Sequence, residues 1–102
     1  MHETSMNIIG ELLIMVKRGN TVRLIGQFYD WDDNPADPDS VTLIIYDNKR
    51  VKIDEVVPLK IEVGKYFYDY VAEKEGSYYY EFKGVIGETP SLNRATFSVH
   101  FY

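Results

Sequence analysis

The fold of this chain is decided by the stretch Gly64-Lys65-Tyr66-Phe67-Tyr68-Asp69-Tyr70-Val71-Ala72-Glu73-Lys74-Glu75-Gly76-Ser77-Tyr78-Tyr79-Tyr80-Glu81-Phe82. Aromatic residues occupy alternate positions before and after a charged turn that ends at Gly76. Side chains at alternate positions of a β-strand point to the same face of a sheet. Two rows of rings separated by a turn therefore predict adjoining strands whose rings fill the core.

The composition indicates one acidic domain without disulfide bonds. The 102 residues are enough for a single hydrophobic core. The chain has no cysteine, which excludes disulfides and thiolate metal sites. With 16 acidic and 11 basic residues, its net charge is -5. A negative surface is a poor match for phosphate backbones, so no nucleic-acid partner is expected.

The N-terminal segment carries no clear targeting signal. Its apolar run, Ile8 to Val16, is interrupted by Glu11, lacks a preceding basic region and has no small-residue cleavage site. The run is too short to span a bilayer, so no membrane partner is expected. We expect residues 1–10 to form a leader and residues 11–102 one domain, in a cytoplasmic or virion-associated protein.

Period-two alternation along the rest of the chain predicts about seven antiparallel strands and no helix. Residues 30–40 and 84–93 are rich in turn residues and are expected to be loops. Gly26 predicts a bulge in its strand, and Pro58 predicts an edge strand or an irregular segment. The expected core consists of Val22, Leu24, Phe28, Leu43, Ile45, Tyr66, Tyr68, Tyr78, Tyr80, Phe82, Phe97, Val99 and Phe101.

Two of the predicted strands, residues 12–16 and 43–46, are apolar on both faces. In a two-layer fold the outward face of a strand is normally wet. One interpretation is that these strands are central and their outer faces are covered by a loop or by the leader. The other is that Leu13, Met15, Ile44 and Tyr46 form an interface with a second copy or another protein.

Three passages resemble immunoglobulin-like (Ig-like) β-sandwich modules. They are the opening at 18–24 (RGNTVRL), the bend at 33–43 (DNPADPDSVTL) and the strand entry at 75–80 (EGSYYY). The combination is similar to small Ig-like proteins of phage and prophage gene sets and to modules of bacterial surface proteins. The resemblance implies an Ig-like antiparallel β-sandwich with a structural or adhesive role.

The chain departs from antibody-type domains because it lacks their cysteine pair, and because Trp31 follows the second strand instead of lying in the third. The likeness is therefore to the sandwich architecture and not to antigen recognition. Tyr78 is expected to form a tyrosine corner, with its hydroxyl bonded to the backbone between Ala72 and Lys74 while its ring packs in the core.

The acidic loop that follows the second predicted strand is a candidate cation site. Ca²⁺ prefers six to eight oxygen ligands, and the spacing of the first residues matches the opening of an EF-hand loop. Pro35 and Val41 then break that match. The alternative is that these side chains bond nearby backbone amides and stabilise a turn. The candidate calcium ligands are Asp30, Asp32, Asp33, Asn34 and Asp37.

Tyr29 and Trp31 border the same loop and could form an aromatic platform for a sugar ring, or could cover the edge of the sheet or complete the core. Catalysis is not expected, since the chain has two histidines, no nucleophile elbow and no phosphate-binding loop. We expect a non-enzymatic structural or protein-interaction module that requires no cofactor. The alternative is a carbohydrate-binding or calcium-stabilised adhesion module.

Overall fold

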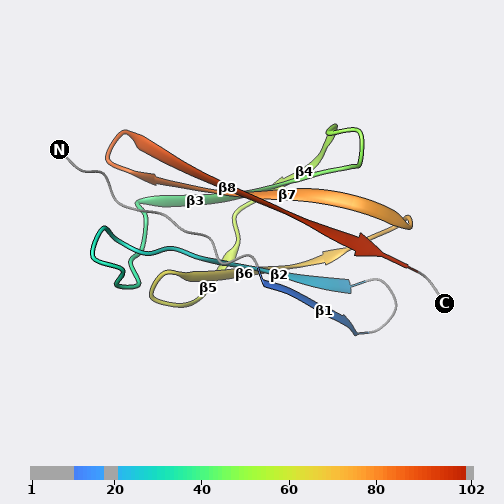
Figure 1. The fold of residues 1–102 in the computed structure, drawn as a ribbon, viewed down its shortest axis with the longest axis horizontal. Helices are drawn as coiled ribbons and strands as arrows, with labels where there is room; N and C mark the ends of the chain where they lie inside the picture. The colour runs from blue at the N-terminus through green and yellow to red at the C-terminus, as the bar shows by residue number, and fades with distance from the viewer. Residues whose placement is uncertain (1–10, 18–20, 101–102) are drawn as a thin grey trace.

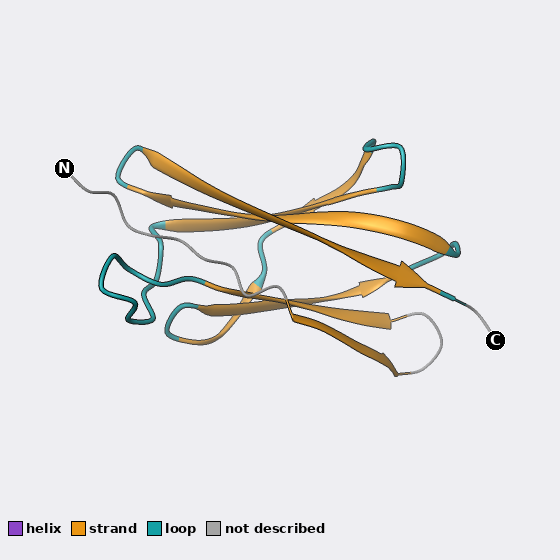
Figure 2. Cartoon of the chain, in the orientation of Figure 1, coloured by secondary structure: helices purple, strands orange, loops and turns teal. Residues whose placement is uncertain are grey.

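The computed structural model describes residues 11–17 and 21–100, in which every regular element is a β-strand (Figure 1, Figure 2). The all-β prediction is thus confirmed, with eight strands in place of about seven. The strands are β1 (Glu11–Lys17), β2 (Thr21–Gln27), β3 (Ser40–Tyr46), β4 (Lys52–Val56), β5 (Leu59–Glu62), β6 (Lys65–Val71), β7 (Gly76–Ile86) and β8 (Thr89–Val99).

The strands form two four-stranded sheets, with orders β1-β2-β6-β5 and β4-β3-β7-β8. All neighbouring strands are antiparallel. The sheets form two layers in Figure 1, where β8 crosses in front of β7 and β3. The opposite edge strand of that sheet, β4, therefore lies on the far side. Only Val57 and Pro58 separate β4 from β5, so these two edge strands form one flank of the molecule.

The core lies between the sheets and is rich in aromatic rings. The rings of Tyr78 and Phe97 are stacked with centroids 5.1 Å apart, and Phe28 meets Tyr66 edge to face at 5.7 Å. Every predicted core residue in the described ranges is buried except Tyr68, which is only partly buried beside the core. Phe101 lies outside the described residues. The alternating rings of β6 and β7 thus fill the core as the sequence predicted.

The tyrosine corner is confirmed. The hydroxyl of Tyr78 donates a hydrogen bond to the backbone carbonyl of Lys74, at 2.6 Å. The Tyr78 ring is buried against the core, so one side chain fixes both the packing of β7 and the path of the turn that precedes it.

Two local predictions are wrong. Residues 84–93 are not a loop, because β7 and β8 pair over eleven positions and turn sharply at Gly87, which has φ 61°. Pro90 is tolerated because β8 is an edge strand. Gly26 is not a bulge, since the register of β2 with β6 is continuous through it. A Cβ atom there would lie 2.8 Å from the ring of Phe82, so glycine is needed for close approach.

Candidate functional site

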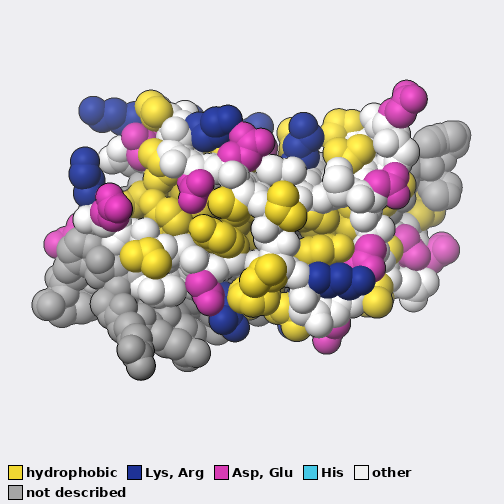
Figure 3. Space-filling view, turned by 180° about the vertical axis from the view of Figure 1, so that it is seen from behind, with side chains coloured by type: hydrophobic (Ala, Val, Ile, Leu, Met, Phe, Trp, Pro, Cys, Tyr) yellow, Lys and Arg dark blue, Asp and Glu magenta, His cyan; other side chains and the backbone are white. Residues whose placement is uncertain are grey.

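The flank formed by β4 and β5 exposes several large apolar side chains. They occupy alternate positions from 51 to 63, apart from Glu55, and each is 43% to 78% exposed. Figure 3, the view from behind, shows hydrophobic side chains gathered along the middle of this face. Exposed apolar side chains that gather in one region mark interaction sites in folded proteins. We call this set the apolar flank: Val51, Ile53, Val57, Leu59, Ile61 and Val63.

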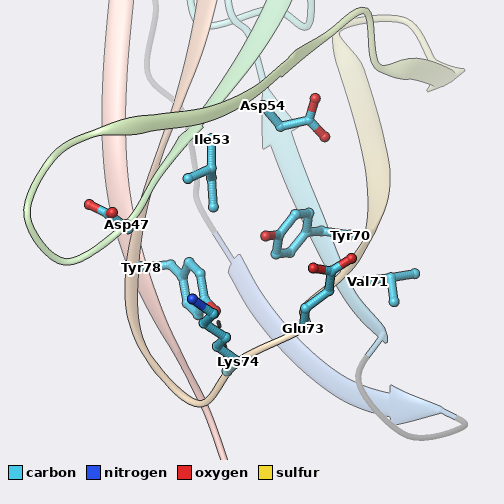
Figure 4. Close-up of a pocket in the computed structure, with 8 residues that line it drawn as sticks. All are labelled: Asp47, Ile53, Asp54, Tyr70, Val71, Glu73, Lys74 and Tyr78. Atoms are coloured by element: carbon cyan, nitrogen blue, oxygen red, sulfur yellow. Dashed lines mark hydrogen bonds between the residues drawn. The ribbon is translucent and has the colours of Figure 1, made fainter.

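A pocket of about 410 Å³ opens beside the apolar flank and shares Ile53 with it (Figure 4). Strand β4, the end of β6 and the turns around residues 47 and 74 supply its walls. In Figure 4 the Tyr70 ring lies between Asp54 above and Glu73 below, with its hydroxyl directed toward the side of Ile53 and Tyr78. We call this the flank pocket; it is lined by Asp47, Ile53, Asp54, Tyr70, Val71, Glu73, Lys74 and Tyr78.

The electrostatics of the flank pocket favour a neutral or cationic group over an anion. Burial raises the pKa of Tyr70, and the nearby charges of Asp54 and Glu73 raise that pKa further. The phenol therefore stays protonated and can donate a hydrogen bond. Three carboxylates outnumber the single ammonium of Lys74. Within the described ranges, no three His, Cys, Asp or Glu side chains are grouped so that they could hold a metal ion.

A second polar site lies on the outer face of the β4-β3-β7-β8 sheet, around a buried carboxylate. Glu81 is only 4% exposed, although it belongs to the face that points away from the core. It accepts hydrogen bonds from Arg94 Nε at 2.7 Å and from the Tyr46 hydroxyl at 3.3 Å. The bond to Glu81 raises the pKa of Arg94. Burial, aided by the charge of Glu81, raises the pKa of Tyr46. The buried charge is thus paired, as buried charges must be.

Arg50 closes this site from the β3–β4 turn. Asp47 organises that turn by accepting backbone hydrogen bonds from Lys49 and Val51 on its Oδ1 atom. Arg50 follows with φ 65°, a left-handed conformation that favours glycine. Its guanidinium carbon lies 4.7 Å from the centroid of the Tyr79 ring, within cation–π range.

A pocket of about 210 Å³ lies between these side chains and is lined by Tyr46, Arg50, Tyr79, Tyr80 and Arg94. We call Tyr46, Arg50, Tyr79, Glu81 and Arg94 the sheet-face cluster. It joins residues from β3, the β3–β4 turn, β7 and β8, which are brought together only by the pairing of the strands.

In the acidic loop, Asp30 and Asp37 accept hydrogen bonds from other parts of the chain. Asp30 Oδ1 accepts the backbone amides of Asp32 and Asn34, at 2.8 and 3.0 Å. Asp32 and Asp33 are exposed. Among the described residues no acidic group is arranged to hold a metal, so the structure gives the predicted calcium site no support. The turn interpretation accounts for the geometry of Asp30.

Asp37 is directed away from that loop toward the β5–β6 hairpin. It accepts hydrogen bonds from Lys60 Nζ at 2.6 Å, the Gly64 amide at 2.7 Å and the Tyr66 hydroxyl at 2.9 Å. These bonds, that of Lys60 first, lower the pKa of Asp37. Burial, with help from Asp37, raises the pKa of Tyr66 to about 12. The residue ties the loop to β5 and β6 and has a structural role.

The other predicted site residues are dispersed over the molecule. Trp31 is 48% exposed in the loop, whereas Tyr29 is half-buried and pairs with Pro35 in an isolated bridge. On β3, Ile44 and Tyr46 are half-buried, and Tyr46 belongs to the sheet-face cluster. The predicted interface residues Leu13 and Met15 lie on β1, and their side chains are outside the described part of the structure.

Sequence reasoning did not identify most of the residues at these two sites. Glu81 and Arg94 are thirteen positions apart and become neighbours only through the hairpin of β7 and β8. A usable signal was present at Arg50, because a turn that begins Asp-Asn commonly continues to glycine. The apolar alternation from 51 to 63 was also visible, but such alternation ordinarily predicts the buried face of a strand, so it did not mark these side chains as exposed.

Comparison with family models, with curated proteins and with solved structures gives no match to this chain. In the ranges that the structure describes, no helix is long and apolar enough to cross a membrane. Function must therefore be inferred from the geometry of the sites themselves.

Proposed function

We propose that this protein is a non-enzymatic, Ig-like interaction module that assembles through its apolar flank, with a second copy of itself as the first partner to test. The single observation that carries the proposal is the exposure of six large apolar side chains from one segment, residues 51–63. Each such side chain is worth about 1.5–3 kcal/mol on full burial, so covering several of them would drive association.

Strand order supports the Ig-like part of the proposal. If the strands are lettered A, B, C, C′, D, E, F and G in chain order, the sheets become A-B-E-D and C′-C-F-G. Ig domains place A, B, E and D in one sheet and C, F and G in the other, with C′ as an addition in variable-type domains. The tyrosine corner at Tyr78, near the start of the F strand, points the same way.

A second copy is the simplest partner because a two-fold interface needs only one surface that is complementary to itself. The apolar flank is interrupted only by Glu55, which is ion-paired with Lys52, so two copies can bury its apolar side chains against each other without leaving that charge unpaired. The likeness to small phage and prophage proteins and to bacterial surface modules fits an assembling role, with a neighbouring protein as the other candidate.

Light scattering over a range of protein concentrations tests this proposal. We expect the wild-type protein to associate and the double variant Leu59→Glu with Ile61→Glu to have the mass of one chain. Leu92→Glu is the matched control, because Leu92 is also about half exposed, at 49%, but lies on the opposite edge strand. A wild-type protein that stays monomeric at every concentration would overturn self-assembly.

Carbohydrate binding is the second candidate function, and the flank pocket favours it. The pocket offers the partly buried ring of Tyr70 and several carboxylates, groups that can stack on a pyranose ring and bond its hydroxyls. The platform predicted at Trp31 lies in a different loop. A glycan array probed with wild type, Tyr70→Ala and Trp31→Ala separates the two locations, and no binding by the wild type would remove this candidate.

A further inference from the structure

We propose that the sheet-face cluster binds a carboxylate group between Arg50 and Arg94, at a site distinct from the apolar flank. The guanidinium of Arg50 has N–H donors available for a ligand. No described carboxylate forms an ion pair with this guanidinium, which lies over the Tyr79 ring. A guanidinium that stacks through its face keeps its N–H groups directed outward in its plane, where they can bind a carboxylate in the bidentate manner.

Arg94 lines the same pocket and also has N–H donors available. Its Nε–H is bonded to Glu81, and its side chain is 66% exposed. A guanidinium has five N–H donors, so this bond leaves further donors directed to solvent. Glu81 therefore fixes the position of Arg94 without using all of its donors, which is how a preorganised anion site is built.

Local charge and size decide the class of ligand. The sheet-face cluster holds two guanidinium groups and one carboxylate, which leaves a net charge of +1 in a chain whose net charge is -5. A carboxylate neutralises that charge, whereas a phosphate dianion would leave an excess negative charge. The pocket of about 210 Å³ is smaller than a typical drug-sized site, so it suits a side-chain carboxylate rather than a large cofactor.

Backbone strain at Arg50 supports a binding role over a stabilising one. Glycine is the residue that a left-handed position of this kind favours, and Arg50 occupies it at φ 65°. The hairpin turn sets this conformation, since the Arg50 amide donates to the Asp47 carbonyl at 2.9 Å, and the choice of arginine over glycine at this position is what a binding role explains. Strained residues of this kind are found where a side chain must be held at a site.

Nuclear magnetic resonance of the arginine Nε–Hε groups tests the site, with sodium acetate as the probe. Acetamide and sodium chloride, at matched concentration and ionic strength, are the comparison solutes. We expect the Arg50 and Arg94 resonances to shift with acetate along a saturable curve, with little change in acetamide. Shifts that never saturate, or that chloride reproduces, would overturn the proposal.

Two variants sharpen the test. Arg50→Gly should abolish the saturable shift at Arg94 and also raise the melting temperature, because glycine relieves the left-handed strain. Lys49→Ala removes one positive charge from the neighbouring position of the same turn and should leave the Arg94 shift intact. If Arg50→Gly leaves the Arg94 response unchanged, or if Lys49→Ala weakens it equally, then a specific carboxylate site is refuted.

Discussion

Tyr78 and Tyr80 test the structure because only one of their two buried hydroxyl groups has a hydrogen-bond partner in the described part of the chain. Both extend from the same face of β7 into the core, and they are 6% and 1% exposed. The hydroxyl of Tyr78 donates to the Lys74 carbonyl at 2.6 Å. The hydroxyl of Tyr80 is buried and has no hydrogen-bond partner among the described residues. Burial raises the pKa of Tyr80, so this phenol remains protonated.

The two Tyr→Phe substitutions remove the same atom but should change stability in opposite directions. Tyr78→Phe loses one hydrogen bond and should lower the free energy of unfolding by about 0.5–1.5 kcal/mol. Tyr80→Phe removes a polar group whose desolvation costs about 1–3 kcal/mol and is not repaid. It should therefore raise the free energy of unfolding. For a domain of this size, each kcal/mol corresponds to about 4–8 °C in melting temperature.

Urea unfolding followed by circular dichroism measures both changes. Tyr79→Phe is the control, because Tyr79 lies on the opposite face of β7, and its change should stay within about 0.5 kcal/mol. A loss of stability in Tyr80→Phe equal to that in Tyr78→Phe would mean that the Tyr80 hydroxyl is bonded. The inference that the buried Tyr80 hydroxyl destabilises the fold would then be wrong.

Two further predictions concern the close packing and the acid stability of the fold. Gly26→Ala should lower the free energy of unfolding by about 1–3 kcal/mol, because its Cβ would lie 2.8 Å from the Phe82 ring, and an unchanged urea midpoint would contradict that contact. Asp37→Asn should be less stable than wild type at neutral pH, with a gap that narrows as pH falls below about 4. Lys60 and the other donors lower the pKa of Asp37 in the folded state. The ionised carboxylate therefore stabilises the fold above the unfolded pKa, and this stabilisation is lost as pH falls through the folded pKa. Urea midpoints at neutral and acidic pH measure the gap, and a gap that does not change with pH would refute it.

Much of the fold could be predicted because its main signal is local. Alternation of large rings, as at Tyr78 and Tyr80, specifies both a strand and its buried face, and the structure agrees. Prediction failed where the structure at a residue depends on which other strands lie next to its own strand. In the sequence Gly26 resembles a bulge residue, but glycine is needed there because the Phe82 ring packs over it. In the sequence Pro90 resembles a loop residue, but proline is tolerated there because β8 is an edge strand.

The sites were harder to predict because their residues meet only through strand pairing. The acidic loop is a dense local cluster that a sequence pattern shows readily, and in the structure Asp30 and Asp37 accept hydrogen bonds from backbone amides. The sheet-face cluster has no local density at all. It depends on the register that sets Glu81 opposite Arg94, and on a turn that brings Arg50 over the same strand. A sequence pattern reports neighbours along the chain, whereas a site on a sheet face is made from neighbours across it.

The edge strand β5 is protected against strand addition, and this bears on the proposed assembly through the apolar flank. Strand β5 is four residues long, follows Pro58, contains Lys60 and has a register shift in its pairing with β6. These are the features with which proteins prevent pairing with another strand. The exposed apolar side chains on that flank therefore do not mark a site for strand addition. They remain available for side-chain packing, which is why substitutions such as Leu59→Glu, which leave the backbone unaltered, should be enough to prevent assembly.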